Sequence, residues 1–595
     1  MKSKLEYEGP VQLRANQLFR AKLFVTPAQT IQTGGRIVVA ARHFSDIGDP
    51  QTDDPESENY ITIDSDASAS FKVNTENPGW GRHPWNRGID LILDEGTIPA
   101  GTEILIHLGN PSHGSPGYRC QSFTETNFRF RLGIDPAGND DWEVLPSKQC
   151  PGFKIVGNVA TGIKCFARNA TRDDGQRELI LKPEDRYGNI AGVGPDSTLL
   201  TLDGSQKLEN VNLEGAHSTK IDIPHDQSYH RLYASTSDGA FYEQSNPFGP
   251  SPIEGYRLFW GEIHAQSRLC DGTNMPRELY RYARDAAGLD FAAVTSHDFE
   301  LTPENWDQVK EATRAAHQPG DFVTFLGYEW SGAHERGGDN NIYFLDDEGP
   351  LVYNAPVAGY PEWDPAEGAV DKTRDLRETI EELQGRQFMV VPHCGGRQCN
   401  FDFYDPGCMP IFEMHSCHRN YEHVAQEAIR RGLRFGFIGG SDDHRGAIGD
   451  SHTTARDRFF SSHSGLVGVY AKELTRESLW KAFFSRRVYA TNGPRIILDV
   501  RLNGALTGEE ITVEAGETLR MEVHAVLDGL LDRIEVFRNT SPVHLLAGGD
   551  QANQIEEFTG AYDEAAPAGN TAYYVRVRQT DGGMAWSSPV WVNAI

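Results

Sequence analysis

Residues 276–297 read PRELYRYARDAAGLDFAAVTSH, and this stretch decides the fold that we predict for the centre of the chain. Residues 277–287 look helical, with Pro276 at the start and a glycine directly after the end. Residues 291–295 are apolar and follow as a short strand, which is succeeded by His297. The stretch therefore predicts a helix, a buried strand and a polar residue at the strand end.

The same alternation of helix and short apolar strand recurs three more times. The expected helices span 303–316, 373–383 and 421–431, and the strands that follow them span 322–326, 388–391 and 435–438. Repeated alternation of this kind predicts a parallel sheet or barrel, with the first strand at 256–263.

The flanking segments have a different pattern. Short alternating runs separated by Gly, Pro, Asn and Asp fill the first 250 residues and return after residue 495, which is typical of β-sandwiches. A chain of 595 residues is too long for one ordinary core. We predict an N-terminal β-sandwich at 1–150, a second β-sandwich at 151–250, a barrel at 251–495 and a C-terminal β-sandwich at 496–595.

The composition of the chain argues against a membrane or a nucleic acid as its partner. No apolar run approaches the roughly 20 residues that span a bilayer, and the start of the chain does not resemble a secretory signal. Eight cysteines in so long a chain do not indicate a disulfide framework, so we expect a cytoplasmic protein that is not bound to a membrane. The net charge of −29, without a basic run, argues against nucleic acid as a ligand. Oligomeric state stays open.

Polar residues at the ends of the central strands carry the chemistry. His297, Glu329 and His393 follow or end three expected strands, and Asp442 and His444 follow a fourth. In parallel α/β barrels the carboxyl ends of the strands converge on one mouth, so these residues should meet there. Imidazole and carboxylate ligands suit Zn²⁺, Mn²⁺ or Fe²⁺.

The same residues carry a family resemblance. The region 256–495 resembles the PHP (polymerase and histidinol phosphatase) superfamily of metal-dependent phosphoesterases. The similar motifs, in chain order, are HAQSRLCDG at 264–272, TSH at 295–297, GYEW at 327–330, PH at 392–393 and SDDH at 441–444. With the flanking sandwiches, the chain more narrowly resembles a branch of that superfamily carried as a domain of unknown function.

The resemblance implies a distorted (β/α)7 barrel of about seven strands, flanked by immunoglobulin-like sandwiches, with two or three divalent metal ions. The expected metal is Mn²⁺ or Zn²⁺, with Fe²⁺ as an alternative. The implied ligands are His264, Gln266, Asp271, His297, Glu329, His393, Asp442 and His444. Gln266 stands where the family has a second histidine, Ser296 where it has an aspartate, and Asn340 or Asn341 where many relatives have a further histidine. These departures favour two metal ions over three.

The function expected from this resemblance is hydrolysis of a phosphate mono- or diester of a small anionic molecule by a metal-bound hydroxide. The expected catalytic residues are Glu329, His297, Asp442, Arg445 and His418. The expected substrate contacts are Arg397, Arg445, His334, His415, His418 and Asn341, because arginine and histidine can hold anionic oxygens.

Two alternatives stay open. The same chemistry could break a sulfate ester, an amide or a lactone, since metal ligands do not fix the bond that is cleaved. The chain could instead be a non-catalytic protein that binds carbohydrate or a partner and keeps a degenerate barrel. Four cysteines between residues 394 and 417 lack a Cys-x-x-Cys pair, so we expect buried thiols there and not structural zinc.

Overall fold

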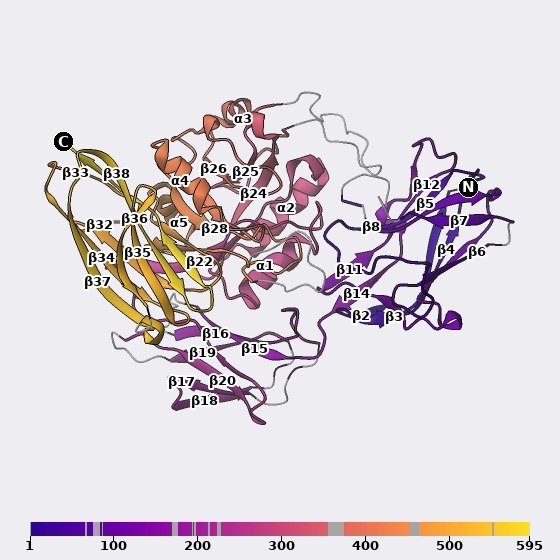
Figure 1. The fold of residues 1–595 in the computed structure, drawn as a ribbon, viewed down its shortest axis with the longest axis horizontal. Helices are drawn as coiled ribbons and strands as arrows, with labels where there is room; N and C mark the ends of the chain where they lie inside the picture. The colour runs from indigo at the N-terminus through magenta and orange to yellow at the C-terminus, as the bar shows by residue number, and fades with distance from the viewer. Residues whose placement is uncertain are drawn as a thin grey trace.

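The computed structural model has β-rich parts at both ends of the chain and a part with helices between them (Figure 1). In Figure 1 the helical part lies between the C-terminal strands on the left and the N-terminal strands on the right. The structure describes residues 2–65, 68–74, 84–85, 87–168, 176–192, 194, 198–211, 213, 215–222, 228–354, 374–450, 463–549 and 552–595.

The N-terminal strands form four sheets. One sheet joins β1 (Lys4–Glu8), β4 (Ala21–Thr26), β9 (Ile104–Leu108) and β6 (Ile61–Ser65). The largest joins β13 (Glu143–Val144), β12 (Arg131–Asp135), β5 (Arg36–Ala41), β8 (Arg87–Glu95) and β7 (Ser70–Val73). The two smaller ones join β11 (Glu125–Arg129), β14 (Gly152–Val156) and β2 (Gln12–Arg14), and β10 (Tyr118–Arg119) with β3 (Leu18–Phe19). Strand β4 alternates buried and half-buried side chains, so one face of its sheet packs on a core.

The next strands form two further sheets around a separate core. One contains β15 (Gly162–Ala167), β16 (Gln176–Glu184) and β19 (His217–Asp222). The other contains β18 (Gln206–Val211), β17 (Thr198–Leu202), β20 (Leu232–Thr236) and β21 (Tyr242–Gln244). Leu179, Leu200 and Leu232 from both sheets are fully buried in the shared core.

All five α-helices of the described residues lie in the central region. They are α1 (Pro276–Asp285), α2 (Pro303–Ala316), α3 (Leu376–Leu383), α4 (Glu422–Arg430) and α5 (Arg476–Phe484). The sequence predicted the first four to within a few residues and missed the fifth. Helix α2 begins where expected because the Thr302 side chain accepts a hydrogen bond from the backbone N–H of Asn305 and proline follows the cap.

The central strands form a mixed sheet with the order β26-β25-β24-β23-β22-β29-β30. These strands are β22 (Arg257–Glu262), β23 (Phe291–Val294), β24 (Val323–Ser331), β25 (Asp339–Phe344), β26 (Phe388–Pro392), β29 (Leu466–Ala471) and β30 (Val488–Thr491). Strands β27 (Ile411–His415) and β28 (Gly436–Gly439) form a separate parallel pair.

The predicted parallel (β/α)7 barrel is therefore wrong. Among the central strands of the sheet that contains β22, only the neighbours β22, β23 and β24 pair in parallel, and the described strands do not close on themselves by hydrogen bonds. After β24 the chain does not cross over through a helix but turns back through the 3₁₀ turn at His334–Arg336 and pairs antiparallel as β25. The fold class is corrected from a barrel between immunoglobulin-like sandwiches to a mostly β-sheet protein with a mixed central sheet.

The C-terminal strands extend that central sheet. Strand β30 pairs with β39 (Met584–Ser587), which continues through β38 (Gly569–Gln579), β35 (Leu531–Arg538) and β36 (Ser541–Gly548). Strands β33 (Glu510–Val513) and β40 (Val590–Ala594) join beside β38. A second sheet has the order β32 (Ala505–Leu506), β31 (Ile497–Leu502), β34 (Thr518–Val526) and β37 (Glu557–Ala565).

Backbone hydrogen bonds cross two of the predicted domain boundaries. Strand β14 pairs with β11 and β2 across residue 150, and β39 pairs with β30 across residue 495. The four domain ranges stay predictions. Among the described residues, no helix combines the length and the apolar character needed to cross a membrane.

Candidate metal centre

Polar side chains gather at the edge where several central strands end. His264 follows β22, His297 follows β23, and Glu329 lies near the end of β24. Because these three strands are parallel neighbours, their carboxyl ends lie at the same edge. The remaining members follow other strands: His393 after β26, and Asp442 and His444 after β28.

Backbone hydrogen bonds hold the loop after β28 against the loop after β22. The N–H of Asp442 donates to the carbonyl oxygen of His264, and the N–H of Gln266 donates to that of Asp443, both at 2.8 Å. Asp442 has a left-handed backbone with φ of 52°, which aspartate and asparagine tolerate better than most residues. The two loops thus bring the Asp442 carboxylate to the ring of His264.

A first group of possible ligands consists of Asp271, His297 and His444. The Oδ1 atom of Asp271 lies 3.6 Å from Nε2 of His297 and 3.3 Å from Nε2 of His444. All three side chains are buried. Two imidazoles and a carboxylate therefore point toward one small volume.

A second group lies beside it and consists of His264, Glu329 and Asp442. Nε2 of His264 is 3.4 Å from Oε2 of Glu329 and 3.3 Å from Oδ1 of Asp442. The same Oε2 atom of Glu329 is 3.1 Å from Nδ1 of His297. Oε1 of Glu329 lies 3.5 Å from Nε2 of His393. Glu329 therefore connects the second group to His297 of the first group and to His393.

The spacing of these atoms fits shared coordination better than hydrogen bonding. Several of the nitrogen-to-oxygen separations are 3.3–3.6 Å, whereas N–H···O hydrogen bonds are usually about 2.7–3.2 Å. Two ligands at about 2.0–2.1 Å from a tetrahedral ion lie about 3.3–3.4 Å apart. The donor set of imidazoles and carboxylates suits a divalent transition ion.

Two buried side chains at the same site lack hydrogen-bond partners among the described residues. Neither ring nitrogen of His393 has one, nor does either atom of the Asn341 amide. Asn341 is directly opposite Glu329 in the β24–β25 pair, so both side chains emerge on the same face. Buried polar groups normally have partners, and a bound ion or substrate would supply them here.

The electrostatics of the site favour a cation. Burial alone would lower the pKa of His264, but Glu413 and Asp442 hold it well above its usual range. This shift reports an excess of negative charge around the ring, which a bound cation would offset. Burial and the neighbouring His264 lower the pKa of His393 to about 3, so that its ring is neutral and keeps a lone pair for coordination.

Sequence reasoning missed three acidic residues that support the ligands. Both carboxylate oxygens of Glu413, on β27, lie 3.0 Å from Nδ1 of His264. Oε1 of Glu262 accepts hydrogen bonds from the backbone N–H groups of His264 and Ser441. Asp339 at the start of β25 can join Glu329 and His393 in a third group of possible ligands. A lone glutamate in the apolar stretch 409–414 was the available signal for Glu413.

Some of the predicted substrate contacts lie at the cluster. Nε2 of His418 is 3.0 Å from Oδ2 of Asp442, and its side chain is one-fifth exposed. Arg397 donates through Nε to Oδ1 of Asp339 at 2.7 Å. Arg445 is buried, and its guanidinium lies 5.8 Å from the ring of Phe123.

Two other predicted contacts do not reach the cluster. His334 is exposed, and its Nδ1 lies 2.9 Å from the backbone oxygen of Gln398. Nε2 of His415 lies 3.0 Å from the backbone oxygen of His463, and its ring stacks at 6.2 Å on Trp586. The β27–β28 register shifts between Glu413 and His415, which accounts for their different surroundings.

Gln266 lies inside the cluster with its amide nitrogen toward the carboxylates. Its Nε2 donates to Oε2 of Glu329, and its Oε1 accepts from Sγ of Cys270 at 3.2 Å. In this orientation the amide does not present its oxygen to the two groups of ligands. The predicted buried thiols Cys394, Cys399, Cys408 and Cys417 are confirmed as buried and not bonded as disulfides.

The loop after β5 contributes side chains to the site. The ring of Phe44 lies 4.0 Å from the ring of His444. Arg42 donates to the backbone oxygens of Arg268 at 2.9 Å and Gly272 at 2.8 Å, and thereby holds the loop that carries Asp271. No motif in the sequence linked these distant segments.

A cleft of about 360 Å³ opens beside this contact. Its lining includes the arginines Arg42, Arg131 and Arg268, together with Trp85 and Glu300. The cleft borders the metal centre because Cys270 and Glu300, which line it, form a group with Asp271. Glu304 lines it as well, so the charged lining consists of three arginines and two glutamates next to the ligand cluster.

Fold and site together define a mostly β-sheet protein with a buried cluster of histidines and carboxylates that could hold metal ions. A family model described as a protein of unknown function (DUF3604) matches residues 278–398 and 450–526. The first of these segments contains His297, Glu329 and His393. The resemblance to a domain of unknown function is thereby confirmed, whereas this match carries nothing about the PHP superfamily.

Relatives are found among chlamydial proteins. An uncharacterized protein of Chlamydia pneumoniae is 24% identical over 547 residues, which cover 83% of this chain and 84% of the relative. An uncharacterized protein of Chlamydia trachomatis serovar D is 23% identical over 548 residues with the same coverage. The similarity therefore extends well beyond the metal centre.

Two solved structures align with this chain at low scores. The adhesin InvE of Yersinia pseudotuberculosis aligns with a TM-score of 0.13 and 10% identity, over 43% of this chain and 60% of that one. A β-glucuronidase of Bacteroides uniformis aligns with a TM-score of 0.17 and 8% identity, over 97% of this chain and 74% of that one. Similarity at this level carries no argument about fold or activity.

Proposed function

We propose that this chain is a metal-dependent hydrolase that cleaves a phosphate ester of a small anionic molecule. The observation that carries the proposal is the junction at Glu329, whose two carboxylate oxygens face His264 and His297 on one side and His393 on the other. Side chains from segments far apart in the sequence converge there with the spacing of metal ligands.

The two adjacent groups of possible ligands would accommodate two metal ions. Asp271, His297 and His444 would hold one ion, and His264, Glu329 and Asp442 would hold the other, with His393 beside Glu329. Asp339 offers a further carboxylate if a third ion binds. Divalent ions at such a site lower the pKa of coordinated water toward neutrality and stabilise negative charge on ester oxygens.

The surrounding side chains provide the remaining functions. His418 lies against Asp442 and is partly exposed, so it is suited to pass a proton to the leaving oxygen. Arg397 is held by Asp339 with part of its guanidinium exposed, and it can orient an anionic oxygen bidentately. Asn341 supplies amide donors and acceptors on the face that carries Glu329.

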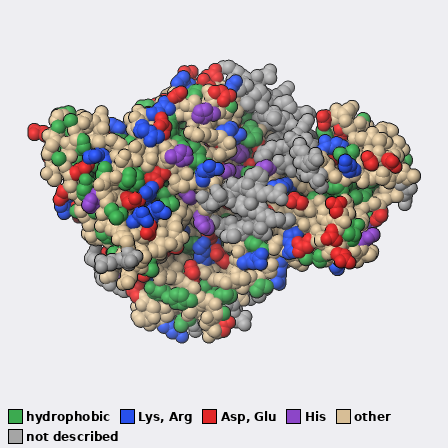
Figure 2. All heavy atoms as spheres, viewed as in Figure 1, with side chains coloured by type: hydrophobic (Ala, Val, Ile, Leu, Met, Phe, Trp, Pro, Cys, Tyr) green, Lys and Arg blue, Asp and Glu red, His purple; other side chains and the backbone are tan. Residues whose placement is uncertain are grey.

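The adjacent cleft supports an anionic substrate. Three guanidinium groups and two carboxylates, those of Glu300 and Glu304, line it, so that its charged lining has a small positive excess in a protein whose net charge is −29. On the face drawn in Figure 2, the described Lys and Arg side chains are interspersed with Asp and Glu. A small anionic ester is therefore a better candidate than an extended nucleic acid.

The choice of phosphate rests on the order of the ligand motifs. His264, His297, Glu329, His393 and the Asp442 loop follow one another as in PHP phosphoesterases, even though the barrel expected with them is wrong. We propose phosphate ester hydrolysis on the basis of this ligand order alone.

The test is metal analysis and hydrolysis with the purified full-length chain. After chelation, the protein is loaded with Mn²⁺ or Zn²⁺ and assayed on aryl phosphate mono- and diesters, aryl sulfates and lactones. We expect about two ions per chain and metal-dependent hydrolysis of a phosphate ester. Turnover of sulfates or lactones alone would correct the bond that is cleaved. Absence of both bound metal and turnover would make the chain a binding protein.

A further inference from the structure

A second hollow lies away from the metal centre, where helix α4 meets the C-terminal strands. It has a volume of about 630 Å³, which is within the range of small-molecule sites. Its walls come from the end of α4 and the loop after it, from the β35–β36 turn, and from β38 and β40. None of its lining residues belongs to the groups of possible metal ligands.

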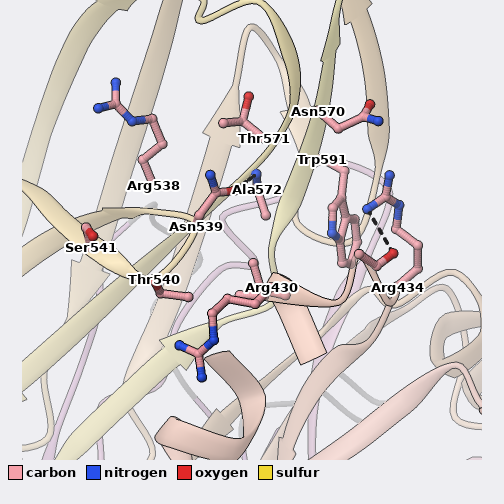
Figure 3. A pocket seen from close by; sticks show the side chains of 12 residues that line it. Arg430, Arg434, Arg538, Asn539, Thr540, Ser541, Asn570, Thr571, Ala572 and Trp591 are labelled. Atoms are coloured by element: carbon pink, nitrogen blue, oxygen red, sulfur yellow. Dashed lines mark hydrogen bonds between the residues drawn. The ribbon is translucent and has the colours of Figure 1, made fainter. Parts of the chain in front are cut away.

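The charged groups at this hollow are three arginines. Figure 3 shows Arg430 at the lower edge, Arg538 at the upper left and Arg434 on the right beside Trp591, with Asn570 at the upper right. Each guanidinium has a carboxylate partner, at 2.9 Å for Arg430 with Glu427, 3.5 Å for Arg434 with Glu510 and 3.1 Å for Arg538 with Glu564. None of these three carboxylates lines the hollow.

Positive charge exceeds negative charge around the hollow. Glu510 is shared, because Arg486 also contacts it at 3.0 Å. The guanidiniums of Arg434 and Arg486 lie 5.4 and 5.0 Å from the ring of Trp591, which borders the hollow. Each guanidinium has five N–H donors in a planar fork, so that one carboxylate partner leaves donors for a ligand.

Two buried donors line the same walls. Nε1 of Trp591 and Oγ1 of Thr571 have no hydrogen-bond partner among the described residues, and the two residues are 3% and 8% exposed. In Figure 3 the indole nitrogen of Trp591 is on the side of the ring that faces Asn539. Buried donors are seldom left unpaired, so these two groups can donate to an acceptor that enters the hollow.

We infer that this hollow binds a small multivalent oxyanion, a molecule with two or more phosphate or carboxylate groups. The arginines lie at separate edges and match charges that are spread over the ligand, whereas Trp591 and Thr571 donate to oxygens between them. The inference does not depend on the proposed hydrolase activity, because it uses none of the residues of the metal centre.

The test is calorimetric titration of the metal-free full-length chain with tripolyphosphate in one series and citrate in another. Removing metal ions first keeps the metal centre from binding the probes. We expect at least one probe to bind, and Arg434→Gln or Arg538→Gln to weaken that binding by about tenfold each. The probe that binds more tightly shows whether the hollow prefers phosphate or carboxylate groups.

Arg533→Gln is the matched control, because Arg533 lies on β35 like Arg538, pairs with Asp532 on the surface and does not line the hollow. It should leave the affinity unchanged. Thr571→Val removes a donor without changing charge and should weaken binding less than the arginine variants. Thermal melting checks that each variant is folded. Failure of both probes to bind at millimolar concentration, or equal affinity in the Arg434, Arg538 and Arg533 variants, would overturn the inference.

Discussion

Nδ1 of His264 lies 3.0 Å from both carboxylate oxygens of Glu413, and both side chains are fully buried. With Nδ1 directed at this carboxylate, Nε2 is left facing Glu329 and Asp442. A carboxylate behind a metal-binding histidine fixes the tautomer and the orientation of the ring and raises its basicity. Glu413 is therefore a positioning residue for His264.

We expect Glu413→Gln to lower metal affinity by about 10- to 100-fold, because the neutral amide no longer supports the imidazole as a ligand. Metal titration of the chelated protein measures this change directly. Glu381→Gln, at an exposed site on α3, serves as the control and should bind metal as the native chain does. Unaltered metal affinity in the Glu413 variant would mean that the pair is only a packing feature.

Asp442→Asn and His297→Ala should each reduce turnover on the order of a thousandfold or more, because each removes a ligand from one of the two groups. Asparagine is the better choice at position 442, since it tolerates the left-handed backbone there. Assays after Mn²⁺ or Zn²⁺ loading measure the loss, and circular dichroism checks the fold. His113→Ala, on the exposed N-terminal part, should keep full activity. Full activity in either ligand variant would refute the assignment.

Phe44→Ala should lower kcat/KM by about tenfold, since the N-terminal ring that packs on His444 at 4.0 Å is lost and the imidazole can move. Metal content should stay close to that of the native chain, because no ligand is removed. Phe44→Leu keeps apolar bulk against His444 and should restore much of the activity. If the alanine variant is as active as the native chain, the N-terminal region does not shape the site.

Asp450 connects the second β-rich part to the loop that follows the metal ligands. Its carboxylate is buried and forms ion pairs with Lys164, at 2.6 Å, and with Lys182, whose side chain is fully buried. Asp450→Asn leaves the buried ammonium group of Lys182 and the partly buried one of Lys164 with Glu184, 3.0 Å from Lys182, as the remaining carboxylate, and we expect a loss of up to about 3–5 kcal/mol in the free energy of unfolding.

The effect of Asp450→Asn should depend on pH. Although burial raises the pKa of Asp450, Lys164 and Lys182 hold it below its usual range, so its stabilisation is complete above about pH 4 and lost as pH falls. The difference in melting temperature between the native chain and the variant should therefore shrink from pH 7 to pH 3. Asp307→Asn, in an exposed pair with Lys310, is the control and should have little effect at either pH. A difference that is constant with pH would contradict the ion-pair explanation.

Local signals predicted four of the five described helices and predicted the topology poorly. Helix α2 was predictable because its cap and proline are encoded next to each other at 302–303. The antiparallel pairing of β25 with β24 was not predictable. Residues 331–339 form only a 3₁₀ turn, and nothing in their sequence indicates that the next strand pairs with β24. Glu413 contacts His264, and Phe44 contacts His444, only because the tertiary fold brings these distant segments together. No sequence motif predicts either contact.

Gln266→His should increase metal affinity at the group formed by His264, Glu329 and Asp442. Gln266 is buried beside these ligands, and its amide nitrogen donates to Glu329, with Oδ1 of Asp442 at 3.5 Å. An amide that donates to the ligands cannot coordinate, whereas a neutral imidazole would bring a lone pair to the same place. We expect Zn²⁺ to bind more tightly than in the native chain, by about tenfold or more, in competition with a chromogenic chelator. Gln266→Leu removes the hydrogen bonds without adding a ligand and should not gain affinity. If the histidine and leucine variants have the same Zn²⁺ affinity, the side chain at position 266 does not face the bound ions.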